Sequence, residues 1–121
     1  MIIEKVNIKN KLSKFSDYWN PRIVGELNRQ HVKLVKAQGE FVWHKHDQED
    51  EMFYLLEGIL KIEFRDQTVV LESNEFIIIP KGVEHRPVAE KEVSIMLFEP
   101  AGTVNTGDNK GQLTRNTLDR I

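Results

Sequence analysis

The chain has 121 residues, about the length of a single domain. Its 40% hydrophobic and 30% charged residues are typical of an ordinary globular protein, and the longest apolar run, residues 76–80, is far too short to cross a bilayer. The 17 basic and 19 acidic residues give a net charge of −2, which disfavours nucleic acid and anionic membranes as partners. The absence of cysteine excludes disulfides, thiolate nucleophiles and cysteine-ligated metals.

The N-terminal segment, residues 1–22, differs in pattern from the rest of the chain. A charge at Glu4 interrupts the first apolar residues, so we see no secretory signal and expect a cytoplasmic protein. Asn20-Pro21 ends the segment. Between these points apolar residues recur every three or four positions, which predicts a short amphipathic helix or an irregular turn packing on a larger body: Ile8, Leu12, Phe15 and Trp19.

Residues 23–100 read as an all-β sandwich or barrel, because short runs rich in Val, Ile and Phe alternate with Gly, Pro, Asn and Asp. No stretch there keeps a helical period. We expect a hairpin turn at Gln38-Gly39 between strands at residues 32–37 and 40–46, and a second turn at Glu57-Gly58. Further strands are expected at residues 52–56, 60–64, 68–72, 76–79 and 93–98.

Two of these expected strands have distinct burial patterns. Residues 60–64 alternate apolar and charged side chains, as in a strand buried on one face. Residues 76–79 are all apolar and predict a strand buried on both faces. After Pro100 the chain is rich in Gly, Asn and Asp, so we expect residues 101–121 to form a loose tail over the surface.

Three of the four histidines fall in two short motifs. In His44-Lys45-His46 the alternation of strand side chains directs both imidazoles to one face and Lys45 to the other. Two inward imidazoles need buried partners, and a divalent cation satisfies both nitrogens at once. Glu51 follows after a gap long enough to turn a corner, and His85 follows the turn Pro80-Lys81-Gly82. Three imidazoles and a carboxylate would leave two positions open on an octahedral metal.

A simpler interpretation of each element exists. A His-x-His pair on a strand is more often a surface or core pair than a ligand pair, and the acidic run at residues 47–51 alone would be a solvated loop. Order and spacing together favour the metal site over these interpretations.

The combined spacing resembles the cupins. Their first motif runs from glycine through His-x-His and glutamate to a second glycine, as in Gly39, His44-Lys45-His46, Glu51 and Gly58. Their second motif joins glycine, Pro-x-Gly, histidine and asparagine, and here Asn74, Pro80-Lys81-Gly82, His85 and Ala89 occupy those positions. The chain departs from the family by one residue fewer before His44, by Asn74 for glycine and by Ala89 for asparagine, and none of these positions is a ligand. Asn tolerates a positive φ, so the turn at Asn74 is expected to survive.

The resemblance implies a cupin double-stranded β-helix, a jelly-roll barrel, with a short N-terminal helical or irregular segment. The chain is most similar to short single-domain bacterial cupins labelled as mannose-6-phosphate-isomerase-like, a label of fold similarity. It implies one divalent metal ion held by His44, His46, Glu51 and His85, without fixing the choice among Fe, Mn, Ni, Co and Zn. It also implies a homodimer.

Strand parity predicts which other side chains line the barrel. Val42, Phe53 and Leu55 should point inward, and Phe41 and Trp43 outward, under the N-terminal segment or in a dimer interface. Lys33 is either a lysine snorkelling from the outer face, the interpretation we favour, or an anchor for an anionic substrate. Three others are expected to play no part in the site: Arg86, which should point outward, Tyr54, which should serve in packing, and His31, which should cap a surface hairpin.

Two functions remain open. The favoured one is a metal-dependent enzyme, dioxygenase-like or isomerase-like, that acts on a small organic molecule, with no separate general base in view. The alternative is a non-catalytic protein that binds a metal or a small molecule. The complete ligand set favours catalysis, and an attached DNA-binding domain, as in sugar-sensing regulators, has no room in this chain.

Overall fold

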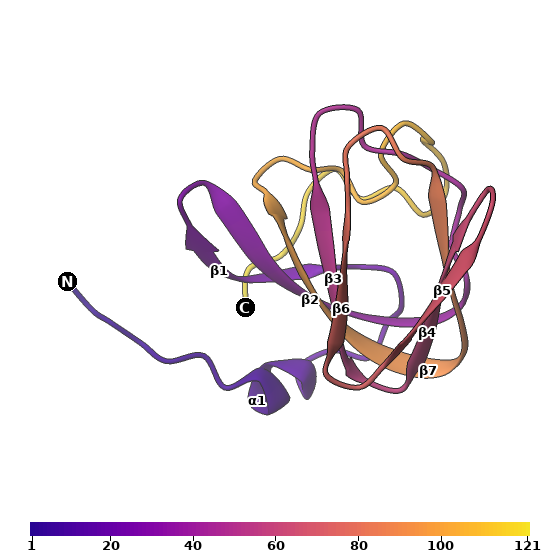
Figure 1. The fold of residues 1–121 in the computed structure, drawn as a ribbon. Coiled ribbons are helices and arrows are strands. Elements are labelled where there is room, and N and C mark those ends of the chain that lie inside the picture. Colours follow the sequence, from indigo (N-terminus) through magenta and orange to yellow (C-terminus); the bar gives the residue numbers. More distant parts are fainter.

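The computed structural model describes residues 1–121 and is built almost entirely from antiparallel strands (Figure 1). One short helix comes first, followed by seven strands: α1 (Ile8–Leu12), β1 (Arg22–Leu27), β2 (Gln30–Glu40), β3 (Glu51–Glu57), β4 (Ile59–Phe64), β5 (Thr68–Glu72), β6 (Glu75–Ile79) and β7 (His85–Pro100). No helix is both long and apolar enough to cross a membrane. The predicted all-β class and jelly-roll barrel are confirmed.

The long strand β7 joins the two halves of the barrel. Its first residues pair with β4, and its last residues pair with β2 on one side and β3 on the other. The order β1-β2-β7-β3-β6 follows from this, with β5 attached through β4. In Figure 1 β7 curves below the other strands and closes the barrel. Both ends of β7 therefore border the barrel interior, where the site lies.

The core fills the barrel with side chains from the inward face of each strand. In β4, Leu60 and Ile62 are fully buried while Lys61 and Glu63, which alternate with them, are not, as the pattern predicts. Ala89, which stands where the family has asparagine, is fully buried in this core. The cluster consists of Val35, Ala37, Phe53, Leu55, Leu60, Ile62, Leu71, Ile79, Ala89, Val93, Ile95 and Leu97.

The predicted turns after β3 and β5 are confirmed. Gly58 has φ +105°, and a Cβ there would lie 2.7 Å from Val93 Cγ1, so only glycine fits. Asn74 has φ +70°, in the left-handed region that asparagine tolerates, so it replaces glycine at the turn before β6.

Two strand predictions are wrong. No hairpin forms at Gln38-Gly39, because β2 continues to Glu40 through an irregularity in its pairing with β7 between Ala37 and Gly39. Strand β6 is not buried on both faces, since Phe76 and Ile78 are 56% and 58% exposed. One face of β6 contributes to the barrel interior and the other is left open to solvent.

The two ends of the chain differ in how closely they pack. Helix α1 has no buried residue, and the chain before it extends away from the barrel (Figure 1). Phe15 and Trp19 do pack on the barrel, but through an irregular segment. The tail is not loose: Thr103 and Thr106 are buried, and Arg120 pairs with Ile23 of β1.

Candidate metal centre

The His-x-His motif lies in residues 41–50, a connection between β2 and β3 that is not a regular strand. Backbone hydrogen bonds join His44 and His85 in both directions, from His44 N to His85 O at 3.1 Å and from His85 N to His44 O at 2.9 Å. Gly82 N donates to His46 O at 2.8 Å. The two histidine motifs, distant in sequence, are thus held together by their own backbones.

The remaining candidate ligand, Glu51, is positioned by the start of a strand, as His85 is. Glu51 is the first residue of β3, and His85 is the first residue of β7. The corner before Glu51 is fixed because Asp50 accepts a hydrogen bond from Lys81 N at 2.9 Å. The glutamate can therefore face the imidazoles from an adjacent strand.

The four predicted ligands converge, each offering one ligand atom, and these atoms lie within 4.8 Å of one another. All four residues are at most 5% exposed. Glu51 Oε1 is 3.5 Å from His46 Nε2 and 3.3 Å from His85 Nε2. The opposite face of the motif carries Lys45, whose side chain is 39% exposed, as parity predicts.

The donor atoms fit a cation. His46 Nε2, His85 Nε2 and Glu51 Oε1 are buried and have no hydrogen-bond partner in the protein. Such atoms are costly unless something satisfies them. On the far side of the rings, Nδ1 of His44 lies 2.9 Å from Val42 O and Nδ1 of His85 lies 3.0 Å from Val83 O. Donation from Nδ1 to these carbonyls leaves Nε2 free as a metal ligand. The cluster could hold a divalent metal ion.

The protonation states of His44 and Glu51 already suit metal binding, whereas His46 would have to lose a proton. Burial, together with the His85 imidazole, lowers the pKa of His44 to about 4, so His44 is neutral. Burial opposes ionisation of Glu51, but contacts with His46, His85 and Glu99 outweigh it and hold the pKa of Glu51 well below its usual range. Burial also disfavours the charged form of His46, yet the Glu51 carboxylate prevails and raises the pKa of His46. A bound cation would take the place of the His46 proton.

A buried pair of polar side chains, Lys33 and Glu99, lies next to Glu51. Lys33 is 1% exposed, and its Nζ donates to Glu99 Oε1 at 2.8 Å and to Thr103 O at 3.4 Å. The interpretation of Lys33 as a snorkelling surface residue is therefore wrong, because its strand position faces the barrel interior. Its ammonium group is hydrogen-bonded to Glu99 and Thr103, which does not support a role as substrate anchor either.

Glu99 has an unusual protonation state. Burial and the negative charge of Glu51 raise the pKa of Glu99 well above its usual range, despite the adjacent Lys33. Its Oε2 is buried and has no hydrogen-bond partner. With a proton there, Oε2 could donate to Glu51 while Oε1 accepts from Lys33. A protonated Glu99 would then support the carboxylate of Glu51.

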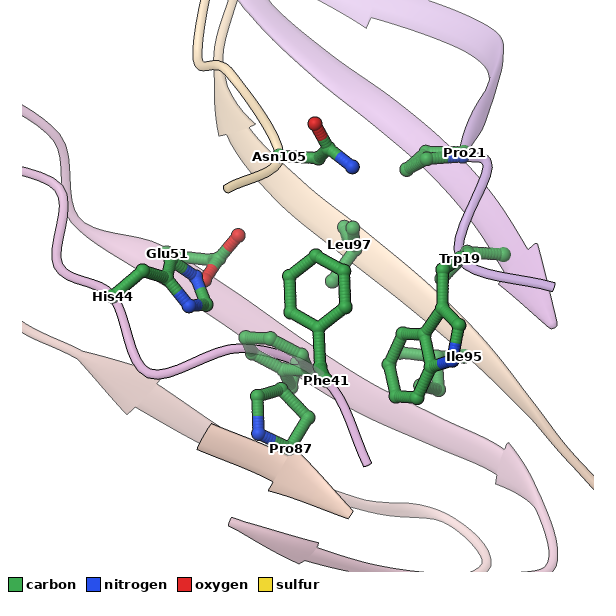
Figure 2. Close-up of a pocket in the computed structure, with 11 residues that line it drawn as sticks. Trp19, Pro21, Phe41, His44, Glu51, Pro87, Ile95, Leu97 and Asn105 are labelled. Carbon is green, nitrogen blue, oxygen red and sulfur yellow. The ribbon is translucent and has the colours of Figure 1, made fainter. Parts of the chain in front are cut away.

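A narrow pocket lies beside the ligands (Figure 2). In Figure 2 His44 and Glu51 form one side, Trp19 lies across from them, and Phe41 projects between. Trp19 and Phe41 stack with ring centroids 4.7 Å apart. The lining consists of Trp19, Pro21, Val35, Phe41, His44, Glu51, Phe53, Pro87, Ile95, Leu97 and Asn105.

Parity predicted only part of this lining. Phe53 and Leu55 are buried in the interior as expected. The predicted directions of Phe41 and Val42 are wrong. Phe41, expected to point outward, lines the pocket, and Val42, expected to point inward, does not. The alternation was counted through residues 41–43, which are not strand, so the inward and outward sides do not follow it. Trp43 lies outside the pocket, under the guanidinium of Arg65 at 3.9 Å from the ring centroid.

Other residues lie as predicted or close to it. Arg86 points away from the pocket and binds Glu63 at 2.7 Å. Tyr54 packs against Phe76. His31 pairs with Glu26 across the β1–β2 hairpin, as expected, but it is buried rather than at the surface.

The sequence did not identify three residues of the site as functional: Trp19, Glu99 and Asn105. Each comes from a segment far in sequence from the histidine motifs. Trp19 was expected only to pack, and Asn105 lies in the expected loose tail. A charge at Glu99 directly after an apolar strand was the one available signal.

Comparison with known proteins identifies the family of this fold. Residues 30–109 match the family described as Cupin domain, so the chain belongs to the cupins. A structure of a cupin-2 domain protein from Shewanella frigidimarina superposes with a TM-score of 0.78 at 49% identity, covering 78% of this chain and 93% of that one. Protein NMB1881 from Neisseria meningitidis gives a TM-score of 0.75 at 31% identity, with coverages of 81% and 100%.

A curated relative is also similar. The uncharacterized protein YdbB from Bacillus subtilis is 41% identical over 80 residues, which span 65% of each chain. The match thus covers just under two thirds of that relative's length.

Proposed function

We propose that this cupin is a metal-dependent enzyme that acts on a small organic molecule. The observation that carries the proposal is the convergence of three buried ligand atoms without protein partners beside a pocket that His44 and Glu51 help to line. A divalent ion held by His44, His46, Glu51 and His85 would supply Lewis acidity, or oxygen binding if it is iron.

The protein's own contribution would be positioning and exclusion of water. The carbonyl groups of Val42 and Val83 orient the imidazoles of His44 and His85, and Glu99 orients the carboxylate of Glu51. The apolar side chains around the pocket keep the reacting molecule out of bulk water. The lining carries no side chain suited to act as a general base apart from the ligands themselves. This restricts the chemistry to what the metal and an oriented substrate provide.

Turnover separates the enzyme from the alternative, a protein that binds a metal or small molecule without converting it. The purified chain would be loaded separately with Fe(II), Mn(II), Ni(II), Co(II) and Zn(II) and incubated with a bacterial small-molecule extract, followed by mass spectrometry and an oxygen electrode. We expect one form to consume a compound and make a product, and Glu51→Gln to abolish this. Retention of a compound in dialysis with no conversion by any form would favour the binding protein.

We also propose that two copies pair through the outer face of β3, β6 and β7. Cross-strand pairing aligns two apolar rows there, one through Phe98, Met52 and Ile78 and the other through Met96, Tyr54 and Phe76. An exposed apolar face without charges is typical of an interface, and a two-fold pair brings the same face from both copies together.

A further inference from the structure

The pocket beside the metal ligands has walls with almost no free polar group. Apart from His44 and Glu51, its polar side chain is Asn105. The amide of Asn105 is engaged by the chain, since it donates one N–H to Leu113 O and accepts from Arg115 N, both at 2.8 Å. Trp19 directs its indole N–H away to Gln38 O at 3.1 Å. A bound molecule would therefore meet mainly carbon, except at the candidate metal ligands and at the second N–H of Asn105.

No cation is available to compensate an anionic group in the pocket. Lys33, buried nearby, is not part of the lining, and its ammonium group is directed to Glu99 and Thr103. Arg86 is on the outside of the barrel, where it pairs with Glu63 and Glu40. The free cavity is small, about 30 Å³, so a charged group would have little water beside it. A phosphate or second carboxylate would have to shed its hydration there without a replacement, which is costly.

We propose that the ligand of this pocket is a compact molecule that is apolar and uncharged apart from the oxygen atoms it offers to the metal. The proposal rests on the proposed function, because the metal supplies the polar half of recognition. Trp19 and Phe41, stacked across from the ligands, make the apolar wall (Figure 2). Sugar phosphates and dicarboxylates are thereby excluded as substrates.

Three hydroxamates with the same chelating head test this class. Acetohydroxamate, isobutyrohydroxamate and phosphonoacetohydroxamate would be titrated into the Co(II)-loaded chain, and the visible spectrum of the cobalt gives each Kd. We expect isobutyrohydroxamate to bind roughly ten-fold more tightly than acetohydroxamate, because its extra methyl groups are buried. Phosphonoacetohydroxamate should bind more weakly than either. Equal affinities, or the charged compound binding best, would overturn the proposal.

A charge placed in the wall should reverse the preference. Trp19 precedes β1 in an irregular segment, so Trp19→Lys changes the wall without altering a strand. In this variant we expect phosphonoacetohydroxamate to gain affinity and isobutyrohydroxamate to lose its advantage. Trp43→Lys is the matched control, because Trp43 lies outside the pocket beside Arg65. The control should keep the order of the unmodified chain, and a reversal in both variants would contradict a local effect.

A metal-free measurement separates failure of the pocket from failure of the metal site. If Co(II) does not bind, the proposed function fails, but the pocket is still tested by NMR. Millimolar isobutanol should shift the indole N–H signal of Trp19 and leave that of Trp43 unchanged, and glycerol 3-phosphate should shift neither. A Trp19 response to glycerol 3-phosphate alone, or to neither compound, would overturn the apolar ligand class.

Discussion

Glu99 lies between the ammonium group of Lys33 and the carboxylate of Glu51, and its protonation links the buried polar groups. Its folded pKa is raised well above the ordinary value of 4.5, first by burial and then by Glu51. A raised carboxyl pKa means that folding takes up a proton. The stabilisation by Glu99 is therefore complete below about pH 4.5 and is lost as the pH rises through the folded pKa.

Replacing Glu99 by glutamine should remove this pH dependence. A glutamine can accept from Lys33 and donate to Glu51, as protonated Glu99 does. In the metal-free chain we expect Glu99→Gln to match the unmodified protein near pH 4.5. Above that pH, the free energy of unfolding of the variant minus that of the unmodified chain should increase by about 1.4 kcal/mol per pH unit, up to the folded pKa of Glu99.

Urea unfolding at a series of pH values measures this difference. Glu90→Gln, on the same strand β7 but exposed, is the control and should show no such trend. A Glu99→Gln curve parallel to that of the unmodified chain at every pH would mean that Glu99 is ionised in the folded protein.

At this scale the sequence predicts which four side chains converge, but not the residues that support them. His44, His46, Glu51 and His85 follow from spacing because two local turns carry them to one point. Lys33 and Glu99 are 66 positions apart and pair only after β2 and β7 lie side by side, so no local pattern marks them.

Among the elements, strand β6 shows that an apolar run in the sequence does not reveal whether one or both faces of a strand are buried. Four consecutive apolar residues are consistent with burial on both faces, but β6 pairs with β3 on one side and leaves Phe76 and Ile78 open to solvent. Whether a second face is covered depends on what packs there, which is not a property of the strand.

The exposed face of β6 gives a testable prediction about assembly. In light scattering after gel filtration we expect the chain to have twice its mass of 14.1 kDa. Phe76→Lys should shift it to the monomer, because a buried unpaired charge in an interface is costly. Ile59→Lys, on β4 and similarly exposed, should leave the dimer intact. A monomeric unmodified chain at tens of micromolar would contradict the proposed pairing.

Parity arguments held wherever a regular strand exists. Leu60 and Ile62 in β4 are inward as predicted, whereas Phe41 and Val42 exchange roles because residues 41–50 form a connection. The histidine pair faces inward in that connection because the backbone of His44 pairs with that of His85, a tertiary contact.

For the whole molecule, metal binding at the candidate site would be coupled to folding of the barrel. The ligands come from the connection after β2, the start of β3 and the start of β7, so a bound ion joins segments that separate on unfolding. An ion that binds only the folded chain stabilises it in proportion to the logarithm of one plus the ratio of free ion concentration to Kd, by about 2.7 kcal/mol when that concentration is a hundred times Kd. For a domain of this size that corresponds to a Tm increase of roughly 10 °C.

The most direct test is the metal content of the chain, purified without an affinity tag or added metal, by elemental mass spectrometry, together with its Tm before and after chelation. The account predicts close to one equivalent of a divalent transition metal and a Tm that falls by roughly 10 °C with chelator. In the His44→Ala/His46→Ala double variant the metal should be absent while the barrel stays folded. Stoichiometric metal retained by the double variant, or no metal and no Tm gain from any added divalent ion, would contradict the metal site.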